Sequence, residues 1–213
     1  HMEVGQPGAP APSAVLEAAR VTLEQGRLGY TEALGRGALR SRIAQHYRDT
    51  YGVDVAADNV VVTTGSSAGF VLAFLAGFDA GARIALPSPG YPAYRNILKA
   101  LDLVPVEIET TAETRWALTP EHLARVNADG PIAGVLVASP ANPTGTMMQP
   151  DALAALVRKA NDLGMWFVSD EIYHGLAYDG RRAASALETS NDAIVVNSFS
   201  KYYCMTGWRI GWM

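Results

Sequence analysis

A lysine near the end of the sequence stands among residues that favour covalent chemistry. Lys201 ends the motif Ser-Phe-Ser-Lys, which begins at Ser198 directly after residues 193–197, a run that is apolar except for Asn197. Arg209 follows Lys201 eight residues later. A lone lysine is usually a solvated surface residue. A lysine amine forms an imine with a carbonyl compound, however, when burial or a nearby cation lowers its pKa. Arg209 and the acidic residue upstream, Asp170, favour this second interpretation.

Asp170 opens the motif Asp-Glu-Ile-Tyr, which ends at Tyr173 and follows the largely apolar residues 165–169. A carboxylate at the end of a buried segment costs free energy unless it is paired. One interpretation is that Asp170 caps the next element. The other is that it pairs with a buried cation, for which a protonated pyridine nitrogen would serve.

Two further turns follow apolar segments. Gly65, Ser66 and Ser67 lie between a β-branched run and a helical pattern, where free N–H groups and the helix dipole favour an anion. A simple serine-capped turn is the alternative, and the turn lacks the G-x-x-x-x-G-K-[ST] pattern of nucleotide triphosphatases. The stretch 139–145 holds two prolines and a glycine around Asn142. It is either only a rigid loop or one that presents the Asn142 amide to a ligand.

These residues must be positioned by the elements around them. Apolar runs predict strands at 60–63, 83–86, 104–108, 134–138, 165–169, 193–197 and 208–212. Helices are expected at 13–25, 37–51, 68–78, 93–101 and 151–163, and Thr119-Pro120-Glu121 opens another. Strands of this kind separated by helices predict a buried, mostly parallel sheet. Ligands bind at the carboxyl ends of such strands, where the residues above lie.

Composition narrows the classes of partner. The 213 residues carry a formal net charge of -4, which does not favour nucleic-acid binding. Cys204 is the single cysteine, so we expect a reducing compartment, the cytoplasm by default. We expect no membrane span and no secretory signal, because the sequence has neither a long apolar run nor a charged start followed by one. We expect no metal site.

Taken as a set, the motifs resemble the fold-type I pyridoxal-phosphate (PLP) enzymes of the aminotransferase class I/II family. The resemblance rests on Asn142–Gly145, Ser169–Tyr173, Ser198–Lys201 and Gly207–Gly211, which occur in this order. It implies an α/β three-layer sandwich with a mostly parallel seven-stranded sheet, in which residues 208–212 form the antiparallel strand. It also implies cis bonds at Ser88–Pro89 and Asn142–Pro143.

The resemblance implies PLP as the cofactor and assigns a role to each motif. Lys201 would hold PLP as an imine and then move a proton at the substrate α-carbon. Asp170 would keep the pyridine nitrogen protonated, and Tyr173 and Asn142 would donate to the phenolic oxygen. The phosphate would be held by Gly65, Ser66, Ser67, Ser198 and Arg209.

Three more residues receive roles from the resemblance. Tyr91 would stack on the cofactor ring. Tyr30 would reach across a homodimer to the partner's phosphate, so that active sites are shared. Gly5, together with Asn142, would contact the substrate, since Gly5 belongs to a segment that closes over it.

We therefore expect residues 1–35 to form an arm and a helix, and residues 36–213 to form a nearly complete PLP-binding domain. The family's C-terminal small domain, which supplies an arginine for the substrate carboxylate, would lie outside this chain. The expected function is amino-group transfer between an L-amino acid and a 2-oxo acid. A carbon–sulfur β-lyase, or an aminotransferase-like sensing domain of a transcription regulator, would share the same motifs.

Overall fold

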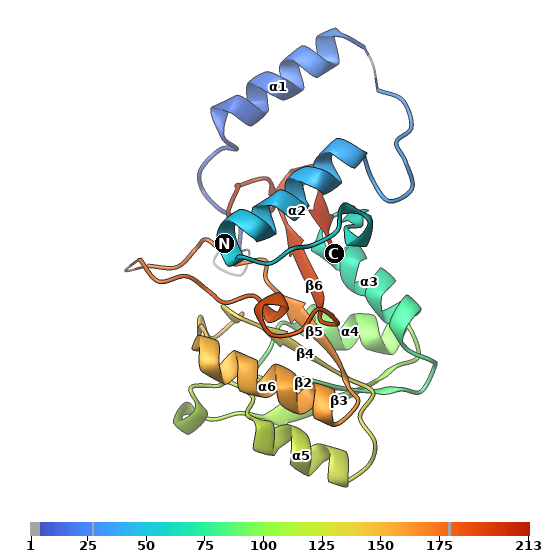
Figure 1. Ribbon diagram of the computed structural model, residues 1–213, viewed down its shortest axis with the longest axis vertical. Coiled ribbons are helices and arrows are strands. Elements are labelled where there is room, and N and C mark those ends of the chain that lie inside the picture. The colour runs from blue at the N-terminus through green and yellow to red at the C-terminus, as the bar shows by residue number, and fades with distance from the viewer. Residues whose placement is uncertain (1–4, 27, 179) are drawn as a thin grey trace.

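The computed structural model describes residues 5–26, 28–178 and 180–213. In these residues one mixed sheet has the strand order β1-β7-β6-β5-β4-β2-β3 (Figure 1). The strands are β1 (Val62–Thr63), β2 (Arg83–Ser88), β3 (Val104–Glu109), β4 (Gly134–Ala138), β5 (Trp166–Asp170), β6 (Ile194–Ser198) and β7 (Gly211–Trp212). The α-helices are α1 (Ser13–Glu24), α2 (Gly37–Tyr51), α3 (Ser66–Gly77), α4 (Pro92–Ala100), α5 (Pro120–Ala128) and α6 (Pro150–Asp162).

The sheet is parallel except at β7. Strands β3, β2, β4, β5 and β6 pair in parallel, and β7 runs antiparallel to both β6 and β1. This confirms the predicted antiparallel strand but shortens it to Gly211–Trp212. Residues Thr206–Trp208 form a 3-10 helix, and Arg209 has a φ of 54°. A residue in that left-handed region cannot continue a strand, so the expected range 208–212 was too long at its start.

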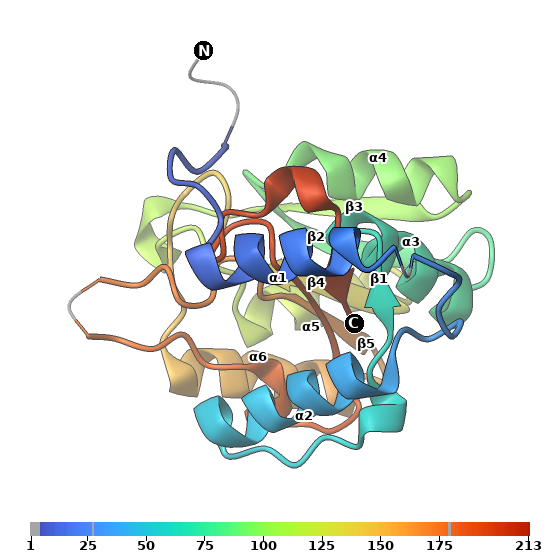
Figure 2. The same ribbon diagram turned by 90° about the horizontal axis from the view of Figure 1, so that it is seen from above.

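Helices cover both faces of the sheet and make a three-layer sandwich, as predicted (Figure 2). Helices α3 and α4 pack on one face through a cluster that includes Phe74, Leu98 and Ile84. Helices α2, α5 and α6 pack on the other face through a second cluster, to which Leu123 and Leu156 belong.

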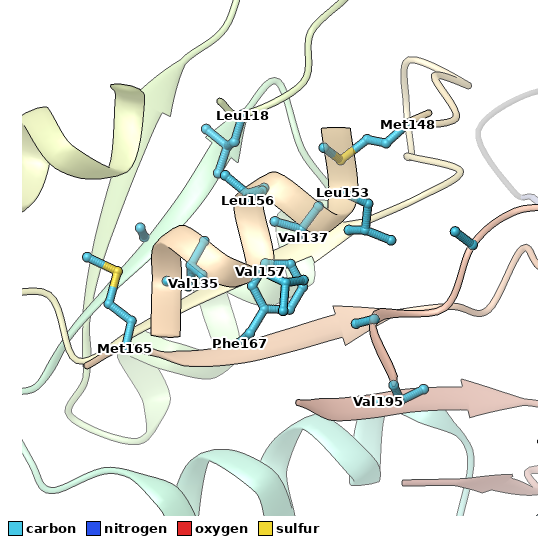
Figure 3. Close-up of a cluster of buried hydrophobic side chains, with 14 of the residues drawn as sticks. Leu118, Val135, Val137, Met148, Leu153, Leu156, Val157, Met165, Phe167 and Val195 are labelled. Carbon is cyan, nitrogen blue, oxygen red and sulfur yellow. The ribbon is translucent and has the colours of Figure 1, made fainter. Parts of the chain in front are cut away.

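Strand β4 shows why the sheet is buried on both faces. Val135 and Val137 belong to the cluster beneath α6, and Leu136 between them belongs to the cluster beneath α3 and α4. Successive side chains of a strand point to opposite faces, so an all-apolar strand is needed where helices cover both. Figure 3 shows the α6 side, where Leu153, Leu156 and Val157 meet Val135, Val137 and Phe167.

Helix α1 stands apart from the body of the molecule (Figure 1). None of its residues is buried, and Leu16, Val21 and Leu23 are exposed. The helix begins at Ser13, as expected, with Pro12 as its N-cap, and no side chain caps it. No helix in the described part of the chain is both long and apolar enough to cross a membrane.

The remaining local expectations concern turns. Ser88–Pro89 and Asn142–Pro143 are cis as predicted, and Ser139–Pro140 is also cis. Thr119 caps α5 and accepts from the backbone N–H of His122, which confirms the expected cap.

Candidate active site

The polar residues singled out above meet at one edge of the sheet. Asp170 ends β5 and Ser198 ends β6, and these strands are parallel neighbours. Because β7 is antiparallel to both β6 and β1, its first residue, Gly211, reaches the same edge as Thr63, the last residue of β1. The turn after β1 and the segment before β7 are therefore adjacent, although they are far apart in the sequence.

A cationic cradle forms where these two segments meet. Gly65 is the N-cap of α3 with a φ of 81°, and a Cβ at this position would collide with the Arg209 guanidinium. A Cβ at Gly211 would lie 2.8 Å from the Gly65 carbonyl carbon and 2.9 Å from the Ser66 nitrogen. Ser66 and Ser67 begin the helix, whose first N–H groups have no partner within it. A helix start beside a guanidinium is an anion-binding arrangement.

The segment after β6 completes this cradle. Ser198 is buried, and its Oγ accepts from the Ser200 N–H at 3.1 Å. Arg209 Nη1 donates to the Thr206 carbonyl at 2.8 Å and lies 3.5 Å from Ser200 Oγ. The guanidinium is thus held on the protein side, while its other nitrogen faces the start of α3.

Lys201 lies next to this cradle, at intermediate exposure. Its Nζ donates to the Gly5 carbonyl of the N-terminal arm. Burial lowers the pKa of Lys201, and the charge of Arg209 lowers this pKa further. A lowered pKa increases the fraction of neutral amine, the form that attacks a carbonyl carbon.

Asp170 is a buried carboxylate that is 4% exposed. Among the described residues, no cationic side chain lies within ion-pair distance of it. Burial raises its pKa to about 6, while hydrogen bonds from Tyr94 and from the Ile172 backbone oppose the rise. The Tyr94 hydroxyl donates to Oδ2, and the Ile172 N–H donates to Oδ1 at 3.0 Å. A positive group above Asp170 would relieve the cost of burying it.

Sequence reasoning missed Tyr94. It lies in α4 three residues after Tyr91, and the two rings meet edge to face with centroids 5.4 Å apart. Tyr91 is exposed, whereas Tyr94 is buried. A tyrosine one helical turn from a candidate stacking residue was the available signal, because residues three apart share a helix face.

Asn142 and Tyr173 lie together beside Asp170. Burial raises the pKa of Tyr173, the charges of Asp170 and Tyr91 add to the rise, and a hydrogen bond with Asn142 opposes it. Both residues line one cleft, which also includes Pro140 and Arg181. The amide and the phenol can therefore donate to one ligand atom.

Tyr30 is the predicted site residue that the structure leaves apart. Its side chain is fully exposed and, within the described ranges, has no hydrogen bond or ring contact. Gly5, by contrast, lies over Lys201, since a Cβ at Gly5 would be 3.6 Å from Nζ.

Comparison with known proteins identifies the family. The family model described as aminotransferase class I and II matches residues 2–213. The chain belongs to this family.

Two curated relatives illustrate the range of similarity. The valine–pyruvate aminotransferase of Mycobacterium tuberculosis is 52% identical over 214 residues, which cover 100% of this chain and 55% of the relative. The aspartate/prephenate aminotransferase of Thermus thermophilus is 33% identical over 211 residues, which cover 99% of this chain and 54% of the relative. The chain thus spans about half the length of these relatives.

Solved aminotransferase structures have the same fold. A crystal structure of an aminotransferase from M. tuberculosis superposes with a TM-score of 0.94 at 53% identity, covering 98% of this chain and 54% of that one. The structure of the T. thermophilus aspartate aminotransferase with maleate superposes with a TM-score of 0.92 at 33% identity, covering 98% of this chain and 55% of that one.

Proposed function

We propose that the full-length protein is a PLP-dependent aminotransferase that moves an amino group between an L-amino acid and a 2-oxo acid. The observation that carries the proposal is the grouping of an amine, an anion cradle and a buried carboxylate at one sheet edge: Lys201, the Gly65–Arg209 contact and Asp170. Family membership supports the same assignment.

The three groups fit the three polar ends of PLP. The aldehyde matches the Lys201 amine, the phosphate matches the cradle, and the pyridine nitrogen matches the buried carboxylate of Asp170. When bound, PLP supplies an aldehyde that condenses with amines and a ring that accepts electrons from the substrate α-carbon.

The residues of the chain then have separate tasks. Lys201 would hold the cofactor through its aldehyde and would carry a proton to and from the substrate α-carbon. Asp170 would keep a proton on the pyridine nitrogen, and Asn142 and Tyr173 would donate to the phenolic oxygen. Tyr91 would cover the ring. The phosphate would be held by Gly65, Ser66, Ser67, Ser198 and Arg209.

For the substrates, we propose a neutral aliphatic amino acid with pyruvate as the acceptor. The support is the 52% identity to the valine–pyruvate aminotransferase of M. tuberculosis. Gly5 and Asn142 would lie on the substrate side, since Gly5 covers Lys201. The carboxylate-binding arginine is expected in a small domain outside residues 36–213, which we propose as the PLP-binding domain after an arm and helix at 1–35.

We also propose a homodimer with shared active sites. The exposed leucines of α1 and the fully exposed Tyr30 support it, because a contiguous apolar helix face is usually covered in the assembled protein. The single cysteine, Cys204, is consistent with our proposal of a cytoplasmic enzyme.

Two measurements on the full-length protein test the activity. Borohydride reduction with PLP, followed by peptide mapping, should label Lys201 and leave Lys99 and Lys159 unlabelled. Incubation with L-valine should convert bound PLP into pyridoxamine phosphate and release the corresponding 2-oxo acid. Release of ammonia from a β-thio-substituted amino acid, with no pyridoxamine phosphate formed, would instead favour the carbon–sulfur lyase. Binding of PLP with neither reaction would favour a sensing domain.

A further inference from the structure

His174 joins helix α2 to the loop that carries Asn142. It follows Tyr173 in the chain and is 8% exposed. Its Nε2 lies 3.0 Å from the carbonyl oxygen of Ser139, the first residue of the loop that carries Asn142. Its Nδ1 lies 2.7 Å from the hydroxyl of Tyr51, the last residue of α2.

These partners define the protonation of the ring. A carbonyl oxygen only accepts, so Nε2 carries a hydrogen and donates to Ser139. Burial lowers the pKa of His174 to about 4, so the imidazole is neutral near pH 7 and Nδ1 is an acceptor. Burial raises the pKa of Tyr51, which keeps its hydroxyl protonated as the donor to Nδ1. The hydrogen bonds therefore run in one direction, from Tyr51 through His174 to Ser139.

Glu171 lies beside the His174 ring but does not favour its protonation. Its Oε1 accepts from Ser169 Oγ, Ser185 Oγ and the Ala186 N–H, at 3.2, 2.9 and 3.0 Å. Its Oε2 is buried without a hydrogen-bond partner among the described residues and lies 3.5 Å from His174 Nδ1. Burial raises the pKa of Glu171 to about 8, so the acid is neutral near pH 7 and does not draw a second proton onto His174.

The loop that accepts the hydrogen bond from His174 has internal hydrogen bonds between its two ends. Ser139 Oγ accepts from the Met148 N–H at 2.9 Å, and the Ala141 N–H donates to the Thr146 carbonyl at 2.9 Å. These two hydrogen bonds join the start of the loop, residues 139–148, to its end. Besides His174, the Ser139 N–H joins this loop to β5 through the Asp170 carbonyl at 3.3 Å.

We propose that His174, oriented by Tyr51, is a positioning residue that holds the Asn142 loop at a fixed distance from Tyr173. It touches neither substrate nor cofactor. It acts through Asn142 and Tyr173, which in the proposed function donate to the same phenolic oxygen of PLP. The catalytic meaning of the inference therefore rests on the proposed function.

The first test uses the visible absorption of PLP bound to the full-length protein. Its pH midpoint reports the proton held between the Lys201 nitrogen and the phenolic oxygen, and donors on that oxygen favour loss of this proton. His174→Phe keeps a ring but removes both nitrogens. We expect the midpoint to rise by about 0.5–1 unit, the effect of weakening one hydrogen bond. Tyr51→Phe should shift it in the same direction by less.

His46→Gln is the matched control. His46 packs edge to face on Tyr51 with ring centroids 5.9 Å apart, and its Nδ1 lies 3.1 Å from Thr50 Oγ1 within α2. Within the described ranges, His46 has no hydrogen bond to the loop. Its replacement removes a histidine beside Tyr51 without breaking the chain of hydrogen bonds, so the midpoint should stay at the wild-type value.

The second test needs no cofactor. In the PLP-free full-length protein, His174→Phe should speed hydrogen exchange at the amides of Ala141 and Met148 and leave β4 unchanged. A lower melting temperature with unchanged midpoint and unchanged loop exchange would overturn the proposal, because a residue that only fills the core gives that result. If the wild type binds no PLP, the proposed function fails and the exchange result alone decides whether His174 holds the loop. If His174→Phe does not fold, Tyr51→Phe decides both tests.

Discussion

At the scale of single residues, Asp170 depends on a hydrogen bond that joins distant parts of the sequence. Tyr94 donates to Asp170 Oδ2 across a separation of 76 positions. Asp170 itself could be predicted, because a carboxylate that ends an apolar run marks the edge of a sheet. For Tyr94 the sequence offers only its spacing of three residues from Tyr91, since packing of the whole sheet decides which face of α4 meets β5.

We expect Tyr94→Phe to raise the pKa of Asp170 above its value of about 6, because the hydroxyl favours the ionised carboxylate. The rise should be about 0.5–1 unit for one lost hydrogen bond. The ring contact with Phe70, at 5.2 Å between centroids, would remain. Titration of carbon-13-labelled aspartate by NMR in the PLP-free protein measures the pKa of Asp170. Tyr91→Phe is the control, and an equal shift there would contradict the assignment.

Glu171→Gln should alter how stability depends on pH. The folded pKa of Glu171 is raised from 4.5 to about 8, so between these values the folded protein keeps a proton that the unfolded chain releases. Wild type therefore loses stability as pH rises through this window, and glutamine does not titrate. The unfolding free energy of the variant should gain about 1–3 kcal/mol relative to wild type between pH 5.5 and 8.5. Urea unfolding of the PLP-free protein at both pH values measures this, and a constant difference would mean that Glu171 is ionised when folded.

At the scale of elements, the apolar runs predicted the sheet well, and the last strand shows the limit. Residues 208–212 contain tryptophan and isoleucine, which favour a strand. The chain nevertheless turns at Arg209, whose φ of 54° aims the guanidinium at the start of α3. The guanidinium lies against Gly65, and no local pattern encodes a contact between segments so far apart.

Gly65→Ala tests this contact between two elements. The new methyl group would meet the Arg209 guanidinium and would be strained at a φ of 81°. We expect the dissociation constant of PLP to rise at least about tenfold, or about 1.4 kcal/mol. Gly77→Ala, at the other end of the same helix where an added Cβ meets no atom, should leave the dissociation constant of PLP unchanged. Pyridoxal, which lacks the phosphate, should lose less affinity than PLP, and equal losses would argue against a phosphate cradle.

At the scale of the whole molecule, none of the residues of α1 is buried and Tyr30 is fully exposed. If active sites are shared, Tyr30→Phe and Lys201→Ala subunits should complement one another when mixed. Each heterodimer would then have one site with both defects and one with neither, so its single active site should bind PLP with wild-type affinity. The weaker PLP affinity of the Tyr30→Phe homodimer would instead place both residues in the same subunit's site.

The position of β7 between β1 and β6 has a consequence for synthesis on the ribosome. Strands β2 to β6 pair as they emerge, but β1 has only β7 as its neighbour in the sheet. The turn at Gly65 leaves the ribosome early and must wait for Arg209 and Gly211. Contacts between such distant segments form late in folding. The nascent chain therefore exposes an unpaired edge of β6 until β7 is inserted, and an unpaired strand edge favours aggregation or chaperone binding.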